Sequence, residues 1–267
     1  MNQIISNAPV FLLLFGRVFA LLMTLPLFSM RSVSGVAKVA LAGYMAFFSL
    51  GNIDLTQYSY MLGADGVASL HFVLLLVGEV LIGIIMGLYV SIIFAAFSSA
   101  GQFIGFQMGL SIASSYDVSS QVENPLMGQF FNLVAMLVFL QTKWFQELFL
   151  NGLTSSFKAI SAVDFALYQE SFVKFLLRGL TNLFADAMII AMPIMGSLFL
   201  ITICTGLLGK AAPQMNLLSE GFPVMIIVGY IIIIFFIPNL VDFFVRSFKS
   251  GFAEMQQLFI SVSGGIK

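Results

Sequence analysis

Ionisable side chains lie inside three long apolar stretches of this 267-residue sequence, where such groups are unusual. They are Arg17 in the stretch 8–28, Glu79 in 68–98 and Asp186 in 179–204. A charged group is costly inside a membrane and normally faces a counter-ion or water. Two kinds of chemistry fit this pattern: a proton or ion relay, as in transporters, and a structural ion pair that fixes the register of neighbouring helices.

Helical spacing indicates which way these charges point. Glu79 shares a face with Gly83 and Gly87, so we expect it to lie at a contact between helices. Arg17 and Lys38, in neighbouring apolar stretches, are its candidate counter-ions. Asp186 belongs to a polar stripe along an otherwise apolar helix, together with Gly179, Asn182, Pro193 and Ser197.

Composition defines the elements that must position these groups. The chain is 60% apolar and only 9% charged, with a mean hydropathy of +1.05, whereas soluble proteins are roughly 45–50% apolar and about 25% charged. These values predict an all-helical, polytopic membrane protein. The net charge of −1 and the scattered Lys and Arg residues argue against nucleic-acid binding.

Six apolar stretches organise the chain: 8–28, 36–50, 68–98, 126–141, 179–204 and 221–245. A crossing takes roughly 20 apolar residues, so 36–50 and 126–141 are predicted to be tilted, buried in protein, or arms of half-crossing hairpins. Prolines within or beside the long stretches predict kinked helices: Pro26, Pro193, Pro213, Pro223 and Pro238.

The distribution of basic residues favours one topology. If all six stretches cross, the loop 142–178 lies on the opposite side from Arg31 and Lys38, against the positive-inside tendency. If the third and fourth stretches instead form one hairpin that counts as a single crossing, Arg31 and Lys38, the loop 142–178, and Arg246 and Lys249 share the cytoplasmic side. This second arrangement predicts an N-terminus outside and a C-terminus in the cytoplasm.

Small residues recur at every fourth position of the third stretch. Such spacing allows helices to approach backbone to backbone in lipid, and it predicts a packing face. We call these residues the rungs of a small-residue ladder. They are Gly83, Gly87, Ser91, Ala95 and Ser99, and the spacing then continues through Gly101, Gly105 and Gly109.

The segment 101–125 is rich in Gly, Ser and Gln, has two acidic residues and has no basic residue. Irregular backbone at membrane depth must be enclosed by protein or line a water-filled cavity, so a constriction or plug is one interpretation. A solvent-exposed loop between two spanning helices is the other. The candidate gate residues are Gly105, Phe106, Gln107, Met108, Gly109, Leu110, Ser111, Ser114 and Asp117.

Two runs resemble the FliR family of export-gate subunits, shared between flagellar and virulence type III secretion systems. The first extends from Gly78 to Asp117, and the second is GLLGKAAPQMNLLSEGFPVMI, from Gly206 to Ile226. One departure is Val118, where many relatives have Pro. The residues of the second run that match the family motif are Lys210, Ala211, Ala212, Pro213, Gln214, Asn216, Gly221 and Pro223.

The resemblance implies a structural and gating subunit of the flagellar protein export channel in the bacterial inner membrane, at the basal body. Family members assemble with two smaller membrane proteins, FliP and FliQ, and contact the gate component FlhB. The implied fold is similar to FliP and FliQ joined end to end, which divides the single unit 1–267 into a FliP-like part, about 1–178, and a FliQ-like part, about 179–267. Unfolded flagellar proteins pass through the channel, and the segment matching 106–122 is expected to help plug it.

A self-contained secondary transporter is the alternative, with Glu79 and Asp186 as coupling sites near the midplane. An enzyme is the weakest class, because His71 is the only histidine and no HExxH pattern or phosphate-binding loop is present. We therefore expect no cofactor and no metal ion.

Overall fold

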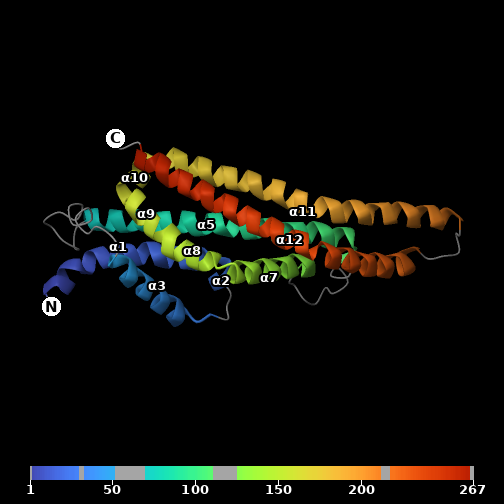
Figure 1. Ribbon diagram of the computed structural model, residues 1–267, viewed down its shortest axis with the longest axis horizontal. Helices are drawn as coiled ribbons and strands as arrows, with labels where there is room; N and C mark the ends of the chain where they lie inside the picture. Colours follow the sequence, from blue (N-terminus) through green and yellow to red (C-terminus); the bar gives the residue numbers. More distant parts are fainter. Residues whose placement is uncertain (1, 30–32, 52–69, 111–124, 212–216, 265–267) are drawn as a thin grey trace. The chain divides into compact units, whose positions relative to one another are not determined.

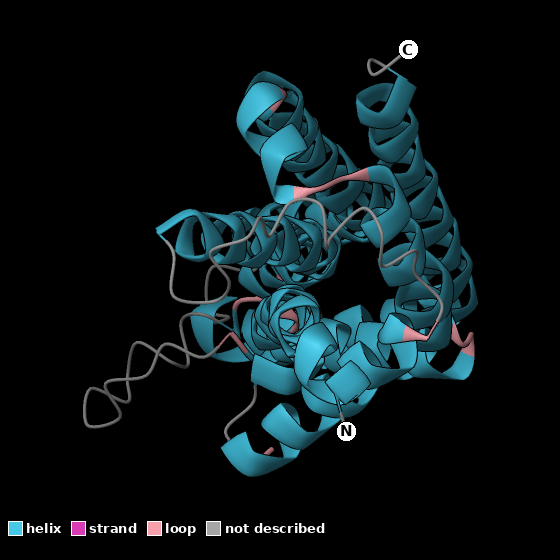
Figure 2. Cartoon of the chain, turned by 90° about the vertical axis from the view of Figure 1, so that its left-hand side faces the viewer, coloured by secondary structure: helices cyan, strands magenta, loops and turns pink. Residues whose placement is uncertain are grey.

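The computed structural model describes residues 2–29, 33–51, 70–110, 125–211 and 217–264. Helices and short loops account for these residues, and no strand occurs among them (Figure 2). The prediction of an all-helical fold is confirmed for the described part of the chain. In chain order (Figure 1) the helices are α1 (Asn2–Thr24), α2 (Pro26–Ser29), α3 (Gly35–Leu50), α5 (Leu70–Gln107), α7 (Leu126–Gln141), α8 (Trp144–Glu147), the π-helical turn η2 (Leu148–Leu153), α9 (Thr154–Ala159), α10 (Ala162–Leu167), α11 (Gln169–Ala211) and α12 (Leu217–Gly264).

Three of the described helices are long and apolar enough to cross a membrane: α5, α11 and the part Gly221–Ser263 of α12. The segments α7 and Trp144–Ala159 add a fourth crossing if together they form one broken span. These helices confirm a polytopic membrane protein. Helices α3 and α7 have 16 residues each, which gives about 24 Å of helix against a hydrocarbon core of roughly 30 Å. Their half-crossing arrangement stays a prediction.

The helix limits confirm one expectation and contradict another. The first apolar stretch is interrupted at Pro26, as the proline predicts, because α1 ends at Thr24 and α2 begins at Pro26. Proline disfavours helical backbone in the residue before it and fits the first position of a new helix. The expectation of a loop from residue 101 is wrong, because α5 continues to Gln107. Gly101 and Gly105 lie against α7, and this contact supports the helix where its composition is least favourable.

The chain forms two compact units, and α5, α11 and α12 contribute to both. Unit 1 consists of Met1–Ile92, Lys143–Leu180 and Lys249–Lys267. Unit 2 consists of Ile93–Thr142 and Thr181–Phe248. Each unit draws on both sides of residue 178, so the division into a FliP-like and a FliQ-like part stays a prediction.

The core of unit 1 forms around α1. Leu14, Val18, Leu21 and Leu22 recur at helical spacing and have no exposed surface. Helix α3 packs against α1 and buries only its small side chains: Ala42, Ala46 and Ser49. Small residues on this face permit a close approach of the two helices.

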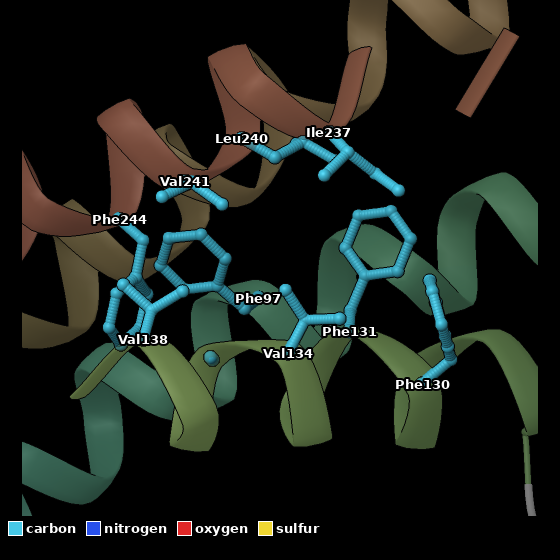
Figure 3. A pocket seen from close by; sticks show the side chains of 10 residues that line it. Phe97, Phe130, Phe131, Val134, Val138, Ile237, Leu240, Val241 and Phe244 are labelled. Atoms are coloured by element: carbon cyan, nitrogen blue, oxygen red, sulfur yellow. The ribbon is translucent and has the colours of Figure 1, made fainter. Parts of the chain in front are cut away.

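The core of unit 2 is an aromatic cluster formed by α5, α7 and α12. The rings of Phe97 and Phe244 have centroids 4.5 Å apart, and those of Phe139 and Phe248 lie 4.7 Å apart. Phe94 contacts three of the other rings edge-on or tilted, which is a favourable arrangement for aromatic pairs. Beside this cluster lies a small apolar pocket with about 20 Å³ of free space, lined by side chains of the same three helices (Figure 3).

Lys143 is the one described residue other than glycine with a positive φ, 61°. It follows α7 and directly precedes α8, and its side chain is exposed. Left-handed backbone costs an L-residue about 1–2 kcal/mol, so Lys143→Gly is expected to raise the free energy of unfolding in detergent by about 1 kcal/mol.

The matched control for this substitution is Gln146→Gly, at an exposed position with helical backbone in α8. It is expected to lower the free energy of unfolding by about 1 kcal/mol, the ordinary helix penalty of glycine. Thermal or denaturant unfolding of both variants checks the pair. Equal losses in the two variants would contradict the assignment of strain to Lys143.

Candidate functional site

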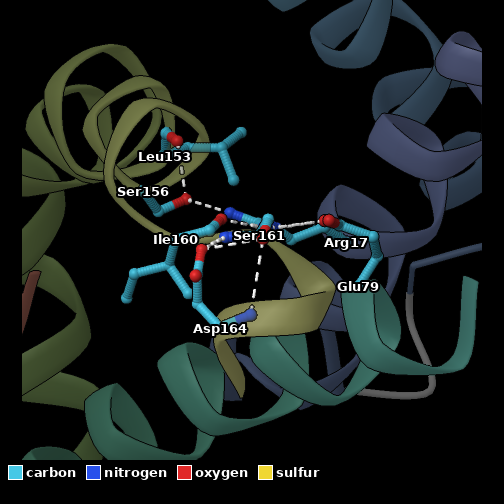
Figure 4. Close-up of polar contacts among 7 residues, drawn as sticks. All are labelled: Arg17, Glu79, Leu153, Ser156, Ile160, Ser161 and Asp164. Atoms are coloured by element: carbon cyan, nitrogen blue, oxygen red, sulfur yellow. Dashed lines mark hydrogen bonds and ion pairs between the residues drawn. The ribbon is translucent and has the colours of Figure 1, made fainter. Parts of the chain in front are cut away.

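A fully buried ion pair joins α1 to α5 in unit 1 (Figure 4). The Nε and Nη2 atoms of Arg17 both lie 2.6 Å from Oε2 of Glu79. The exposed fractions of the two side chains are 0% and 1%. Arg17 is therefore the counter-ion of Glu79 in the structure, whereas Lys38 lies half-buried on α3.

Helix α9 and the turn that follows it complete this site. Nη1 of Arg17 donates to Oγ of Ser156 at 3.1 Å, and Nη2 donates to the carbonyl oxygen of Ile160 at 2.8 Å. The ring of Phe157 lies under the guanidinium group, 4.5 Å from centroid to Cζ. Every nitrogen of the guanidinium group thus has an acceptor, which a buried Arg requires because its desolvation is expensive.

Local sequence explains why this turn reaches Arg17. Ser161 and Asp164 form a capping box at the start of α10, with Oγ of Ser161 2.7 Å from Oδ2 of Asp164. Gly78 lies under the same turn, and a Cβ on it would meet Cβ of Ala162 at 2.7 Å. The turn can approach α5 only because residue 78 has no side chain.

The first rungs of the small-residue ladder contact α1 within unit 1. A Cβ on Gly83 would collide with the carbonyl oxygen of Arg17, and a Cβ on Gly87 would collide with Oγ1 of Thr24. Oγ of Ser91 donates to the carbonyl oxygen of Thr24 at 2.5 Å. Glu79 therefore reaches Arg17 along a seam where the backbones of α5 and α1 touch.

The later rungs contact α7 within unit 2, and the contact is reciprocal. A Cβ on Gly101 would lie 2.5 Å from the carbonyl oxygen of Met127, and a Cβ on Gly128 would lie 3.0 Å from the carbonyl oxygen of Ser98. Gly105 faces only the side chain of Met127, 3.1 Å from its Cβ. Ala95, the rung between the two seams, is half-buried.

The candidate gate residues that the structure describes form the last turn of α5 and the three residues after it. Met108 is fully buried, whereas Phe106 is 73% exposed. Gly109 has a φ of 79° and ends the helix, with its amide donating to the carbonyl oxygen of Phe106 at 3.0 Å. Gln107 and Leu110 are half-buried. Ser111, Ser114 and Asp117 lie outside the described residues.

The other predicted residues have separate positions. Asp186 accepts a hydrogen bond of 2.6 Å from Oγ of Ser247 within unit 2. Lys210 and Ala211 form the end of α11, and Gly221 and Pro223 lie in the first turns of α12. The motif residues between these helices lie outside the described part of the chain: Ala212, Pro213, Gln214 and Asn216.

A second polar cluster of unit 1 was not predicted from the sequence. The hydroxyl group of Tyr89 donates to Oε2 of Glu254 at 2.8 Å, and Nε of Arg178 lies 3.9 Å from Oε1 of the same carboxylate. The Tyr89 ring stacks on Phe175 and covers Gly179. A Tyr inside an apolar helix and a Glu near the end of the chain were visible signals, but nothing in their spacing connects them.

Known proteins resemble this chain over nearly its whole length. The family model of the bacterial export proteins, family 1, matches residues 8–251. Flagellar biosynthetic protein FliR of Bacillus subtilis is 35% identical over 237 residues, which cover 88% of each chain. The proteins of the same name from Borreliella burgdorferi and Escherichia coli are 31% and 29% identical, over 84% and 85% of this chain and 81% and 84% of their own.

Removing one partner of the buried ion pair is expected to destabilise unit 1 strongly. Arg17→Ala leaves the Glu79 carboxylate buried without its counter-ion, and such a loss costs about 3–5 kcal/mol of folding free energy. The double variant Arg17→Met, Glu79→Leu is expected to lose much less, because it leaves no buried charge.

Unfolding in detergent measures these losses, with the exposed pair Glu170 and Lys174 of α11, 2.7 Å apart, as the control. Glu170→Ala is expected to change the free energy of unfolding little, because the side chains of Glu170 and Lys174 are both exposed to solvent. If Arg17→Ala proved as mild as Glu170→Ala, the ion pair would not hold unit 1 together.

The seam between α5 and α7 predicts an order of severity among glycine substitutions. Gly101→Ala forces a Cβ against backbone and is expected to cost about 1–3 kcal/mol, while Gly105→Ala meets a side chain that can shift and costs less. Gly196→Ala in α11, where nothing lies within 4 Å, is expected to gain up to about 1 kcal/mol of helix propensity. Unfolding of the three purified variants tests this order, and a reversed order of the first two would refute the seam.

Proposed function

Since the chain belongs to the FliR family of the bacterial export proteins, we propose that it is a structural subunit of the flagellar export apparatus that helps to form and plug the export channel. The observation that carries this proposal is the family match across residues 8–251, which covers all of unit 2 and most of unit 1. The chain is therefore a component of protein export, and we propose no enzymatic activity for it.

An inner-membrane location fits the family and the apolar helices α5, α11 and α12. We propose an N-terminus outside and a C-terminus in the cytoplasm. The support is the distribution of charge: the basic residues Arg31, Lys38, Arg246 and Lys249 lie beside or at the ends of apolar stretches, on what would be the cytoplasmic side.

We propose FliP-like and FliQ-like membrane proteins as neighbours, together with an FlhB-like gate component. Exposed apolar side chains on α11 and α12 support this part of the proposal. Phe184, Phe199, Ile234 and Phe235 are 57–77% exposed, and faces of this kind must be covered by lipid or by other helices. An extended, unfolded protein chain is the proposed substrate.

The proposed plug is the segment 105–122. A channel that admits an extended chain and still excludes ions needs a closure that is uncharged, soft and displaceable. The described base of the segment supports this role: glycine at 105 and 109 permits backbone movement, and Met108 is a flexible apolar side chain. The buried position of Met108 gives the segment a fixed starting point.

The alternative of a secondary transporter requires Glu79 and Asp186 to exchange ions with water. Glu79 is instead enclosed by Arg17 and the turn between α9 and α10, with 1% of its surface exposed. This geometry favours a structural ion pair. Reconstitution discriminates the two functions, because a transporter moves solutes as a single purified chain and a gate subunit does not.

Deleting residues 110–116 tests the plug directly. The deletion is expected to raise ion leakage through the assembled export complex, measured as conductance in a lipid bilayer or as salt sensitivity of growing cells. Replacement of the same seven positions by Gly and Ser is the control for chain length, and it is expected to leak as well because it removes the apolar side chains. Unchanged leakage together with normal export of flagellar proteins would reject the plug.

A further inference from the structure

The two sequence runs that carry the family resemblance meet in unit 2. Gly109, near the end of the first run, lies under the ring of Phe222, in the second run. A Cβ on Gly109 would lie 2.5 Å from Cδ1 and 2.7 Å from Cε1 of that ring. Together with the left-handed φ of 79°, this contact leaves glycine as the only residue that fits at position 109 without strain.

Two turns further along α12, Gly229 receives the side chain of Met108. A Cβ on Gly229 would lie 2.7–2.9 Å from Cε, Cγ and Sδ of Met108. Met108 has no exposed surface, while its neighbour Phe106 is 73% exposed. The chain directly after α5 is therefore held on α12 by the side chain of Met108, while Phe106 in the last turn of the helix stays exposed.

Phe222, Met225 and Gly229 share one face of α12, because residues three, four and seven positions apart lie above one another on a helix. Met225 is 8% exposed, and Oγ1 of Thr202 on α11 lies 3.9 Å from its sulfur atom. We call this face of α12 the seat. It consists of the ring of Phe222 at one end, the buried side chain of Met225 in the middle, and at the other end the gap above Gly229, which we call the notch.

The contacts that Met108 and Gly109 make with this seat are apolar. Such contacts are individually weak and non-directional, and Met is the most adaptable apolar side chain. The seat can therefore hold Met108 and Gly109 in one position and release them without breaking a hydrogen bond or an ion pair between these residues.

We propose that Phe222 and Gly229 are positioning residues that seat the base of the plug, and that export requires Met108 to leave the notch at Gly229. The inference rests on the proposed plug and adds its regulation: the first half of α12 sets the resting position of the plug. It also gives a role to Phe222, which lies between the family-motif residues Gly221 and Pro223: its ring covers Gly109.

A reversible covalent lock tests the inference. Cγ of Met108 lies 2.8 Å from the ideal Cβ of Gly229, so two Cβ atoms there are within about 4.3 Å, inside the range of about 3.5–4.5 Å for disulfides. The double variant Met108→Cys, Gly229→Cys is made in a Cys204→Ser background and oxidised in the assembled export complex. Bond formation is read by mass spectrometry, and export of flagellar proteins is measured before and after reduction.

The expected result is a disulfide in most molecules, loss of export while it is closed, and return of export after reduction. The control is Phe106→Cys, Gly229→Cys, whose first position points away from the seat and is expected neither to cross-link nor to block export. Failure of the first pair to cross-link would overturn the seat and leave the plug proposal untouched. A complete cross-link with undiminished export would overturn the requirement for release.

Two compensating substitutions, one that enlarges residue 229 and one that shortens residue 108, provide a second test. Loss of folding would not produce the expected recovery of the ion leak in the double variant. Gly229→Val expels the Met108 side chain from its notch and is expected to raise the resting ion leak of the complex. Adding Met108→Ala makes room for the valine and is expected to return the leak toward that of the unchanged protein. If Met108→Ala made the leak of Gly229→Val worse, the two residues would not act through this contact.

Discussion

Direct contact between the backbone of α5 and the backbones of its neighbours is the constraint on which the other features depend. In unit 1 the contact is with α1 through Gly83 and Gly87, and in unit 2 it is with α7 through Gly101. In lipid there is little hydrophobic gain from bringing helices together, so close packing and internal polar bonds must supply the association. Longer side chains at these rungs would separate the helices.

The buried ion pair depends on this contact. Arg17 and Glu79 can meet without exposed surface because Gly83, one turn after Glu79, brings the two helices together. The ion pair also fixes the register of α1 along α5, which close packing alone does not do. Only one alignment of α1 on α5 satisfies both charges, and the bonds to Ser156 and Ile160 include the turn before α10 in the same alignment. A charge buried in this way costs stability unless all of its bonds form, so it penalises other alignments.

Sequence patterns predicted the faces of the helices better than their partners. The fourfold spacing of small residues identified the packing face of α5, because helical periodicity is local. It did not indicate that α1 meets the first rungs and α7 the later ones, or that Gly128 faces Ser98 in return.

Arg17 and Lys38 were equivalent candidates by position for the counter-ion of Glu79. The choice between them depends on Ser156 of α9 and on Ile160 in the turn after it, both more than 130 residues away in sequence from Arg17. Such distant contacts leave no trace in local spacing. The continuation of α5 to Gln107 was missed because Gly and polar residues there resemble a loop until the packing against α7 is known. The capping box of Ser161 and Asp164, in contrast, is a short-range signal that could have been found.

Amide hydrogen exchange of the purified chain in detergent tests the central role of the α5 contacts most directly. Gly87→Val places a branched side chain where even a Cβ collides with Oγ1 of Thr24 and approaches the carbonyl oxygen of Leu21. If backbone contact holds the helices together, this variant will exchange its amides faster along both α1 and the first half of α5. Exchange identical to that of the unchanged protein in both helices would contradict the account.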